Sequence, residues 1–343
     1  MEDITGEWAP YRLNFLFEAR TSRASMRHKD TYFVRLRHSD GREGWGEAAL
    51  FKGLSDDDCP DFERVLSYYC QHPEEIEECR YSAVRFGIES ALRQLDEGIH
   101  PWPGRGQISI NGLIWMGDKA TMKRRIEAKL SEGFRLLKLK IGGIDFNDEL
   151  DLLREIRHHY GSDVLELRLD ANGSFSPDEA LQRLEALAQF GIHSIEQPVR
   201  AGQPEVMRRV CAESPIPIAL DEELIGCSSG EYKRQLLDYV KPSYIILKPA
   251  LCGGLSGAAE WGHAATEAGI GYWYTSALES NIGLDAIARE VLENWLTMPQ
   301  GLGTGELYDN NIPSPVMRNG AVLTYDRNKK WQFPILQWNT RSF

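Results

Sequence analysis

The sequence lacks the features that mark membrane-spanning, secreted and zinc-binding proteins. No apolar run approaches the roughly 18 residues of a membrane span, and the opening MEDITGEWAPYRL contains no apolar stretch typical of a signal peptide. The six cysteines include no C-x-x-C pair, and no H-E-x-x-H motif occurs. We therefore expect no zinc, and reduced thiols in a cytoplasmic protein.

The chain also lacks an excess of positive charge. It has 39 lysines and arginines against 51 acidic residues, a formal net charge of −12. This balance argues against nucleic acid or an anionic membrane as a partner. An anionic small molecule remains compatible with it, because a metal ion and a few lysines can reverse the local field.

Residues 1–102 have a different pattern from the rest of the chain. Aromatic, alternating segments predict strands at Tyr11–Arg20 and Thr31–His38, followed by a hairpin into WGEAAL. Apolar residues at helical spacing then predict helices at Phe62–Cys70 and Ser82–Leu95. Strands followed by helices indicate a small α+β domain.

Strand and helix signals alternate over residues 103–311, which favours a (β/α)8-type barrel capped by the first domain. A doubly wound sheet would show G-x-G-x-x-G after its first strand, and none is there. The tail, 312–343, is expected to pack back on the first domain. The expected barrel strands are Ile108–Ile114, Leu136–Gly142, Val164–Asn172, Ser194–Pro198, Ile218–Glu222, Tyr244–Pro249, Gly271–Ser276 and a weak eighth at Gly301–Glu306.

Two helices in this part are predicted from their periodicity and end signals. One covers Phe146–Tyr160. The other covers Pro177–Phe190, with Ser176 as its N-cap and Gly191 as its stop.

The most informative feature is a series of charged residues near the ends of five apolar runs, LLKLKIG, ELRLDAN, SIEQP, IALDEE and YIILKP. The charged residues recur at intervals of roughly 25 to 30 residues, the length of a strand, a helix and two loops. They should therefore meet at the carboxyl ends of successive parallel strands, where barrel enzymes hold their sites. The series consists of Lys138, Lys140, Asp170, Glu196, Asp221 and Lys248.

Strand periodicity points this charge into the barrel. Lys138 shares a strand face with Lys140, as Glu166 does with Arg168 and Asp170, and leucines occupy the opposite faces. Buried charges need partners, so a purely structural ion-pair network, such as Glu166–Arg168 and Lys138–Asp170, is the alternative. The gathering of charge at the carboxyl strand ends favours a functional site.

Three converging carboxylates repel one another unless a divalent cation lies among them. Asp170, Glu196 and Asp221 are hard oxygen ligands. Such ligands suit Mg²⁺, with Mn²⁺ as the alternative. The sequence therefore predicts a metal site with room for a substrate carboxylate.

Two lysines should flank that metal. Lys140 is the candidate base, because Lys138 on the same face and a nearby cation both lower its pKa from about 10.4. Lys248 should approach from the opposite side of the barrel. This arrangement fits removal of a proton α to a metal-bound carboxylate. An inactive barrel kept as a binding protein is the alternative from another class, and the intact set of lysines and carboxylates argues against it.

The ordered motifs K-x-K, D-A-N, E-Q-P, D-E and K-P resemble the enolase superfamily, muconate-lactonising subgroup, over roughly residues 105–308. Members of the mandelate racemase type carry a His–Asp dyad where this chain has Lys248, which disfavours that subgroup. The segment SALESNIGLDAIA and Arg168 are similar to the o-succinylbenzoate synthases of the muconate-lactonising subgroup.

This resemblance implies a hydro-lyase of menaquinone biosynthesis. It would dehydrate 2-succinyl-6-hydroxy-2,4-cyclohexadiene-1-carboxylate to 2-succinylbenzoate through a metal-stabilised enediolate, with Lys140 as base and Lys248 as a stabilising cation. Substrate-binding residues and supporting residues also follow from it, although the serines and the glutamate of the first group could equally cap the following helix. The substrate-binding candidates are Arg168, Ser276, Glu279 and Ser280, and the supporting ones are Asn172 and Glu222.

Two other activities of this family stay open. An N-succinylamino acid racemase would share every catalytic residue, whereas dipeptide epimerases usually show D-x-D where this chain has Leu278 and Glu279. Specificity in the family is set by two mobile loops of the first domain. The candidates are TSRASMRHKD, with Arg23 and Arg27 able to meet a carboxylate, and LFKGLSDDD.

Overall fold

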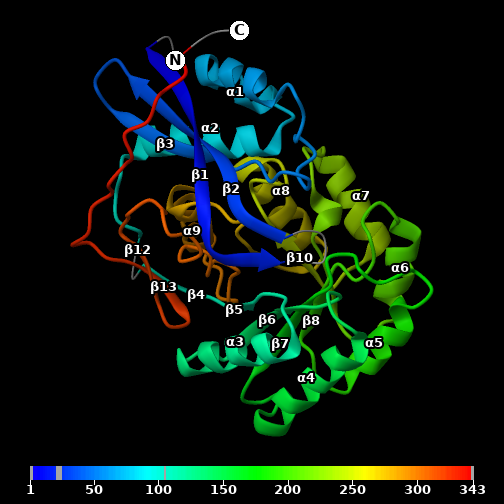
Figure 1. Cartoon of the computed structure of the whole chain (residues 1–343). Helices are drawn as coiled ribbons and strands as arrows, with labels where there is room; N and C mark the ends of the chain where they lie inside the picture. Colours follow the sequence, from blue (N-terminus) through cyan, green and yellow to red (C-terminus); the bar gives the residue numbers. More distant parts are fainter. Residues whose placement is uncertain (1–2, 21–24, 104–105, 341–343) are drawn as a thin grey trace.

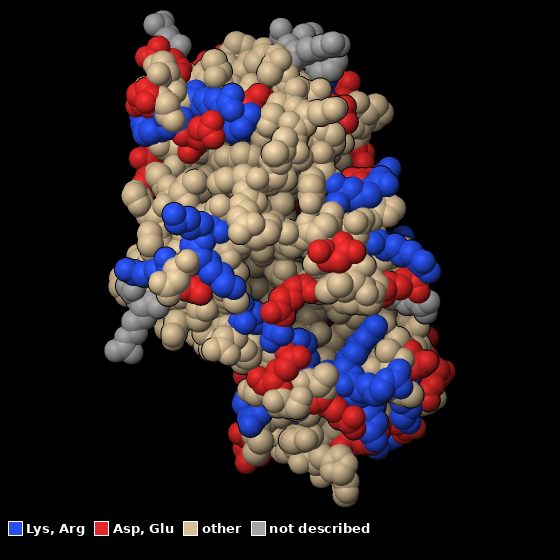
Figure 2. Space-filling model, turned by 60° about the vertical axis from the view of Figure 1, so that its left-hand side comes forward, with Lys and Arg blue, Asp and Glu red and all other residues tan. Residues whose placement is uncertain are grey.

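The computed structural model describes residues 3–20, 25–103 and 106–340. Figure 1 shows an antiparallel sheet and its helices at one end of the molecule, and parallel strands alternating with helices at the other. Acidic and basic side chains are interspersed on the face seen in Figure 2. Among the described residues, no helix is both long and apolar enough to cross a membrane.

The first sheet is an antiparallel meander of three strands in the order β1-β2-β3. Alternation along β2 buries Lys29, Thr31 and Phe33 on one face. The expectation of a loop over residues 21–30 is wrong from residue 25 onward, because the ladder with β1 continues there and pairs Leu13 with Lys29. The strands are β1 Ile4–Arg20, β2 Ser25–His38 and β3 Glu43–Ala48.

Helix α2 covers this sheet with a buried apolar stripe that includes Val84, Ile88 and Ala91. The helix lies very close to β3, since a Cβ added at Gly46 would meet the carbonyl oxygen of Gly87 at 1.9 Å. Only glycine fits at such a contact. The helical elements of this part are α1 Phe62–Gln71, η1 Pro73–Glu78 and α2 Ser82–Glu97.

The second sheet has seven parallel strands in the order β11-β10-β9-β8-β7-β6-β5, an α/β arrangement that forms a half-barrel. Successive strands are neighbours, so their carboxyl ends lie side by side. The strands are β5 Gly112–Ile114, β6 Leu136–Lys140, β7 Glu166–Asp170, β8 Ser194–Glu196, β9 Ile218–Leu220, β10 Tyr244–Leu247 and β11 Gly271–Tyr274. The helices are α3 Lys119–Ser131, α4 Phe146–His159, α5 Ala180–Ala188, α6 Pro204–Glu213, the 3-10 turn η2 Glu222–Leu224, α7 Gly230–Val240, α8 Gly254–Glu267 and α9 Asn281–Glu293.

The expected eighth strand at Gly301–Glu306 is not formed in the described chain. Two residues take its place between the sheet edges: Gln300 forms an isolated parallel bridge with Ile110, and Gly301 forms another with Thr275. Backbone hydrogen bonds on both sides support these bridges. A two-residue contact of this kind carries too little periodicity to be predicted as a strand.

Two further expectations are corrected by the structure. The single strand expected at Ile108–Ile114 is two strands in different sheets, because β4 (Gln107–Ser109) pairs with the C-terminal hairpin and β5 with the parallel sheet. Helix α5 begins at Ala180, and the hydroxyl of Ser176 donates to Glu179. Ser176 is therefore not the N-cap.

The C-terminal tail contacts both parts of the fold. The hairpin of β12 (Val316–Asn319) and β13 (Val322–Tyr325) forms a three-stranded sheet with β4. Beyond it the chain runs back along the side of the molecule to the first sheet (Figure 1), where the ring of Phe333 stacks on Trp45 at 4.2 Å between centroids.

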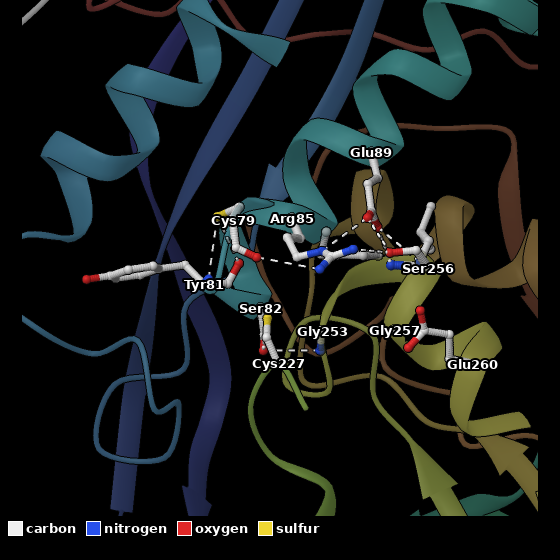
Figure 3. A network of polar contacts seen from close by, with 12 residues as sticks. Cys79, Tyr81, Ser82, Arg85, Glu89, Cys227, Gly253, Ser256, Gly257 and Glu260 are labelled. Atoms are coloured by element: carbon white, nitrogen blue, oxygen red, sulfur yellow. Dashed lines mark hydrogen bonds and ion pairs between the residues drawn. The ribbon is translucent and has the colours of Figure 1, made fainter. Parts of the chain in front are cut away.

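Helices α2 and α8 form a polar clamp that joins the first sheet and its helices to the parallel-sheet part, shown in Figure 3. The carboxylate of Glu89 accepts hydrogen bonds from the backbone N–H of Leu255 at 2.6 Å and of Ser256 at 3.2 Å, in the first turn of α8. Arg85 donates to the Ser256 hydroxyl at 2.6 Å. An anion at a helix N-terminus is favoured by the orphan N–H groups and the helix dipole.

Candidate active site

Register in the parallel sheet brings the predicted charges together. Lys140 pairs with Asp170 across β6 and β7, and Asp170 pairs with Glu196 across β7 and β8. Asp221 directly follows β9 and Lys248 directly follows β10. All five therefore lie at the carboxyl edge of adjacent strands, as the sequence predicted.

The lysine ammonium groups lie between the carboxylates. Lys138 Nζ is 2.6 Å from a Glu196 oxygen and 3.0 Å from an Asp170 oxygen, and Lys140 Nζ is 2.9 Å from the same Asp170 oxygen. Lys248 contacts Asp221 and lies 3.6 Å from Glu196. Every carboxylate of the predicted metal site thus has a lysine partner.

Burial and close charges shift the pKa values of this cluster in opposite directions. Burial works against the Asp170 charge, but Lys138, Lys140 and Lys248 outweigh it and hold the pKa of Asp170 well below its usual range. Burial, with the nearby Asp170 charge, raises the pKa of Glu196 to about 7. For Lys248, burial is outweighed by Asp221 and Glu196, and its pKa is raised. Lys248 is therefore cationic at neutral pH.

The carboxylates fit a divalent cation by their donor chemistry. They are buried oxygen donors, and the Oε1 atom of Glu196 is buried with no hydrogen-bond partner among the described residues. The ligand atoms of these three carboxylates do not all lie within 4.8 Å of one another, whereas within the described chain those of His72, Glu74 and Glu75 do. The lysines that separate the predicted ligands account for that difference.

A cavity of about 780 Å³ opens above this cluster. Its floor includes Lys138, Lys140, Asp170 and Lys248, so two lysines from β6 and the one after β10 face the same space. The roof comes from the first sheet and the loop after β3. The roof residues are Glu18, Ser25, Met26, Arg27, His28, Lys29, Asp30, Phe51, Lys52, Gly53 and Leu54.

Both segments predicted to set specificity therefore contribute to the cavity. Arg27 lines it, and so do the residues from Phe51 to Leu54. Arg23 lies outside the described residues.

The residues predicted to bind substrate are placed differently from one another. Ser276 lines the cavity. Arg168 is buried one layer below, where it donates to the carbonyl oxygen of Pro299 at 3.1 Å and its guanidinium lies 4.1 Å from the ring centre of Trp273. Burial lowers the pKa of Arg168. Arg168 is not among the residues that line the cavity, so its predicted role in substrate binding stays a prediction.

Glu279 and Ser280 face the first sheet instead of the cavity floor. The Ser276 hydroxyl donates to Glu279 at 2.5 Å, and the Ser280 hydroxyl donates to Glu47 of β3 at 2.5 Å. Ser280 is also the N-cap of α9, where its side chain accepts from the N–H of Ile282. Of the residues for which helix capping was the alternative, Ser280 therefore does cap the helix.

The two ion pairs of the structural alternative are both present. Glu166 bonds Arg168 at 3.2 Å, and Lys138 bonds Asp170 at 3.0 Å. The Glu166 pair lies away from the cavity lining, whereas the Lys138 pair is part of it. The ion pair that lines the cavity and the ion pair that does not thus lie in different layers of the sheet.

Asn172 and Glu222, predicted to support the lysines, form a short chain of contacts. The Asn172 carbonyl oxygen accepts from Lys140 Nζ at 2.9 Å, and the Asn172 amide donates to Glu222 at 3.2 Å. Asn172 has a left-handed φ of 45°, which asparagine tolerates better than most residues. This chain fixes the direction of the Lys140 ammonium group.

Sequence reasoning missed a buried residue that orients two of the carboxylates. Gln197 directly follows Glu196, and its side-chain oxygen accepts from the N–H of Asp221 at 3.0 Å. Its amide group donates to the Val199 carbonyl. The E-Q-P run was the available signal, because a glutamine beside a ligand at a strand end can tie that strand to the next.

Comparison with known proteins gives a family match. A family model described as "Enolase C-terminal domain-like" matches residues 121–325. The chain is 44% identical to the o-succinylbenzoate synthase of Desulfotalea psychrophila (strain LSv54 / DSM 12343), covering 91% of this chain and 96% of that protein. It is 25% identical to the L-Ala-D/L-Glu epimerase of Bacillus subtilis (strain 168), over 76% of each.

A solved structure agrees with these matches. The crystal structure of MenC from Desulfotalea psychrophila LSv54 has a TM-score of 0.79 and 40% sequence identity to this chain, and the match covers 94% of this chain and 99% of that one. The superfamily expected from the ordered motifs is therefore confirmed. The chain belongs to the enolase C-terminal domain-like family.

Proposed function

We propose that the protein is an o-succinylbenzoate synthase, a hydro-lyase that converts 2-succinyl-6-hydroxy-2,4-cyclohexadiene-1-carboxylate into 2-succinylbenzoate for menaquinone biosynthesis. The observation that carries the proposal is the pair Lys140 and Lys248, which face one cavity from strands on opposite sides of a carboxylate cluster. The 44% identity to a synthase over nearly the whole chain supports this activity over the epimerase, at 25%.

Asp170, Glu196 and Asp221 would hold the metal. Mg²⁺ suits these hard oxygen donors, and Mn²⁺ is the alternative. When bound, the ion would supply positive charge beside the substrate carboxylate and so make the α-proton more acidic. Gln197 would keep Glu196 and Asp221 in register for this role through its hydrogen bond to the Asp221 backbone.

Lys140 would act as the base. The hydrogen bond that its Nζ atom donates to the side-chain oxygen of Asn172 directs this atom. In the neutral form the nitrogen would take the proton from the ring carbon that bears the carboxylate. The C–H electrons would form a ring double bond as the C–O bond to the hydroxyl group breaks. Lys140 would return the proton to the departing hydroxide, which leaves as water, and the ring becomes aromatic.

Lys248 would stay cationic throughout. Its pKa is raised because Asp221 and Glu196 outweigh its burial, so it is held as an ammonium group. A fixed positive charge at this position stabilises negative charge that develops on the substrate. In a racemase of this family, the same lysine would have to exchange protons itself.

We also propose the finer architecture that this function requires. The bridges at Gln300 and Gly301 would close the parallel sheet into a (β/α)8-type barrel over residues 103–311. Residues 1–102, together with the tail 312–343, would form the cap, with the stacking of Phe333 on Trp45 in support. The six free cysteines suit a cytoplasmic location.

Two assays test the activity. The purified protein with Mg²⁺ should dehydrate the cyclohexadiene acid, which steady-state kinetics would follow as 2-succinylbenzoate accumulates. Incubation of N-succinylamino acids in heavy water would report α-deuterium incorporation. Rapid deuterium exchange without dehydration would replace the synthase assignment by the racemase.

A further inference from the structure

The roof of the cavity contains one buried lysine that the proposed reaction does not use. Lys29 lies on β2, is 6% exposed and lines the cavity. Its Nζ atom is buried and has no hydrogen-bond partner among the described residues. An ammonium group in such a position is costly unless an anion or another acceptor meets it.

The acidic neighbours of Lys29, Glu47 and Glu279, form no hydrogen bond with it, and the Oε1 atom of Glu279 also has no hydrogen-bond partner among the described residues. Glu47 accepts hydrogen bonds from the Thr31 hydroxyl at 2.9 Å and from the N-terminus of α9, where it bonds the N–H groups of Ser280 at 3.0 Å and Gly283 at 3.1 Å. Glu279 accepts from Ser276. Both carboxylates favour the Lys29 charge through space, but burial is the larger effect and lowers the pKa of Lys29.

The proposed substrate has a group that would complete this environment. Its ring carboxylate belongs with the carboxylate and lysine cluster of the floor, and its succinyl arm ends in a second carboxylate. That arm has to extend from the floor toward the roof, where Lys29 is the cation that is buried. The other roof cations, Arg27 and Lys52, are exposed, and solvent and salt screen their attraction for an anion.

We propose that Lys29 binds the terminal carboxylate of the substrate's succinyl arm and thereby selects dicarboxylate substrates. This inference rests on the proposed function, because it takes the second carboxylate from that substrate. It assigns β2 of the first sheet a direct part in recognition. Removal of Lys29 should weaken the binding of ligands that have the terminal carboxylate and leave the binding of ligands without it unchanged.

The test compares two ligands on purified protein in Mg²⁺. Isothermal titration calorimetry would measure Kd for 2-succinylbenzoate and for 2-butanoylbenzoate, which carries a methyl group in place of the terminal carboxylate. The variant Lys29→Met removes the charge and keeps much of the volume. We expect this variant to weaken the binding of 2-succinylbenzoate by about 10- to 100-fold, which is the effect of one hydrogen bond to a charged group. The binding of 2-butanoylbenzoate should weaken by less than about twofold.

Two matched variants separate Lys29 from the other roof cations. Lys52→Met tests assignment of the carboxylate to the loop after β3: selective loss of 2-succinylbenzoate binding there, with none in Lys29→Met, would refute the role of Lys29. Arg27→Met tests the competing assignment of the carboxylate to Arg27. The proposal would be overturned if Arg27→Met selectively lost affinity for 2-succinylbenzoate while Lys29→Met did not. It would also be overturned if Lys29→Met lost affinity for both ligands equally. The control is Lys123→Met, because Lys123 is exposed and outside the cavity lining, and this variant should change both affinities by less than about twofold.

A measurement on the unaltered protein covers the case in which Lys29→Met does not fold. The wild-type protein should bind 2-succinylbenzoate about 10-fold or more tightly than 2-butanoylbenzoate, and equal affinities would refute the role of Lys29. Failure of the wild-type protein to dehydrate the cyclohexadiene acid would instead refute the proposed function. The two failures are therefore distinguishable.

Discussion

Two of the junctions between the first sheet with its helices and the rest of the chain differ in character. At the clamp between α2 and α8, Glu89 accepts three hydrogen bonds from Leu255 and Ser256, and Arg85 donates to the same serine. Around the cavity, several buried polar atoms have no hydrogen-bond partner among the described residues. They are Lys29 Nζ, Asn111 Oδ1, Trp115 Nε1, Thr275 Oγ1 and Thr304 Oγ1.

The contrast separates stability from function. A buried polar group without a partner costs free energy of about 1–3 kcal/mol, so folding alone does not favour such groups. Their position around the cavity indicates a place where a partner such as substrate or water arrives from outside. The clamp needs no such partner, since its donors and acceptors satisfy one another.

Metal chelation should have the largest effect on activity, and it should affect the cavity without affecting the clamp. Because the carboxylates of Asp170, Glu196 and Asp221 would hold the metal, we expect dialysis against EDTA to abolish dehydration and Mg²⁺ or Mn²⁺ to restore it. Turnover before and after metal addition is the measurement. Full activity in excess EDTA would remove the metal assignment.

Lys140→Ala should lower turnover by about 10²- to 10⁴-fold, the usual contribution of a positioned general base. The variant should fold normally, because Lys138 still pairs with Asp170. Steady-state kinetics and α-hydrogen exchange in heavy water would measure the loss, with the exposed Lys123→Ala as the control. Unchanged exchange in Lys140→Ala would show that another group is the base.

Lys248→Ala should lower kcat by about 10²- to 10³-fold, as expected for the loss of one stabilising charge. Lys248→Arg keeps the cation and should retain more activity than Lys248→Ala. If the protein were a racemase, both variants should lose activity to the same extent, since arginine is a very poor base. Comparison of kcat for the two variants therefore sharpens the distinction between synthase and racemase.

Arg168→Met should have a moderate effect on Mg²⁺ affinity, because it removes a positive charge near the carboxylates. The guanidinium attracts Glu196 but does not line the cavity, so its loss should tighten Mg²⁺ binding by roughly threefold to tenfold with little change in KM at saturating metal. Metal titration and KM would measure the two effects. A large rise in KM with unchanged Mg²⁺ affinity would instead support the direct substrate contact predicted from the sequence.

Glu89→Ala should have the smallest effect on catalysis and act on the clamp. We expect about 1–3 kcal/mol lower free energy of unfolding, because the N-terminus of α8 loses its carboxylate partner, and a nearly unchanged kcat. Urea denaturation and turnover are the measurements. Glu89→Gln, which keeps an acceptor, should be less destabilised, and the exposed Glu77→Ala should match the wild type. A large fall in kcat with unchanged stability would remove the distinction between the two junctions.

Much of the site could be predicted because parallel strands impose a simple geometry. Each βα unit delivers its strand end beside the previous one, so Lys140, Asp170, Glu196 and Lys248 had to meet once the repeat was recognised. Short elements were harder. The bridges at Gln300 and Gly301 are too short to show a periodicity. The dipeptide Asn111-Gly112, where β5 begins, is a turn signal, but the apolar residues on both sides of it predict one continuous strand.

The sequence by itself determined the family, the order of the charged residues and their arrival at one edge of the parallel sheet, because strand alternation and repeat length are local properties. Only the tertiary structure decided which charges face the cavity. Arg168 shares a strand face with Asp170 yet lies under it on Trp273, and Ser280 turns toward Glu47. Lys29, in a segment that reads as a polar loop, enters the cavity because β2 pairs with β1 along its length. Such placements depend on contacts between residues far apart in the chain.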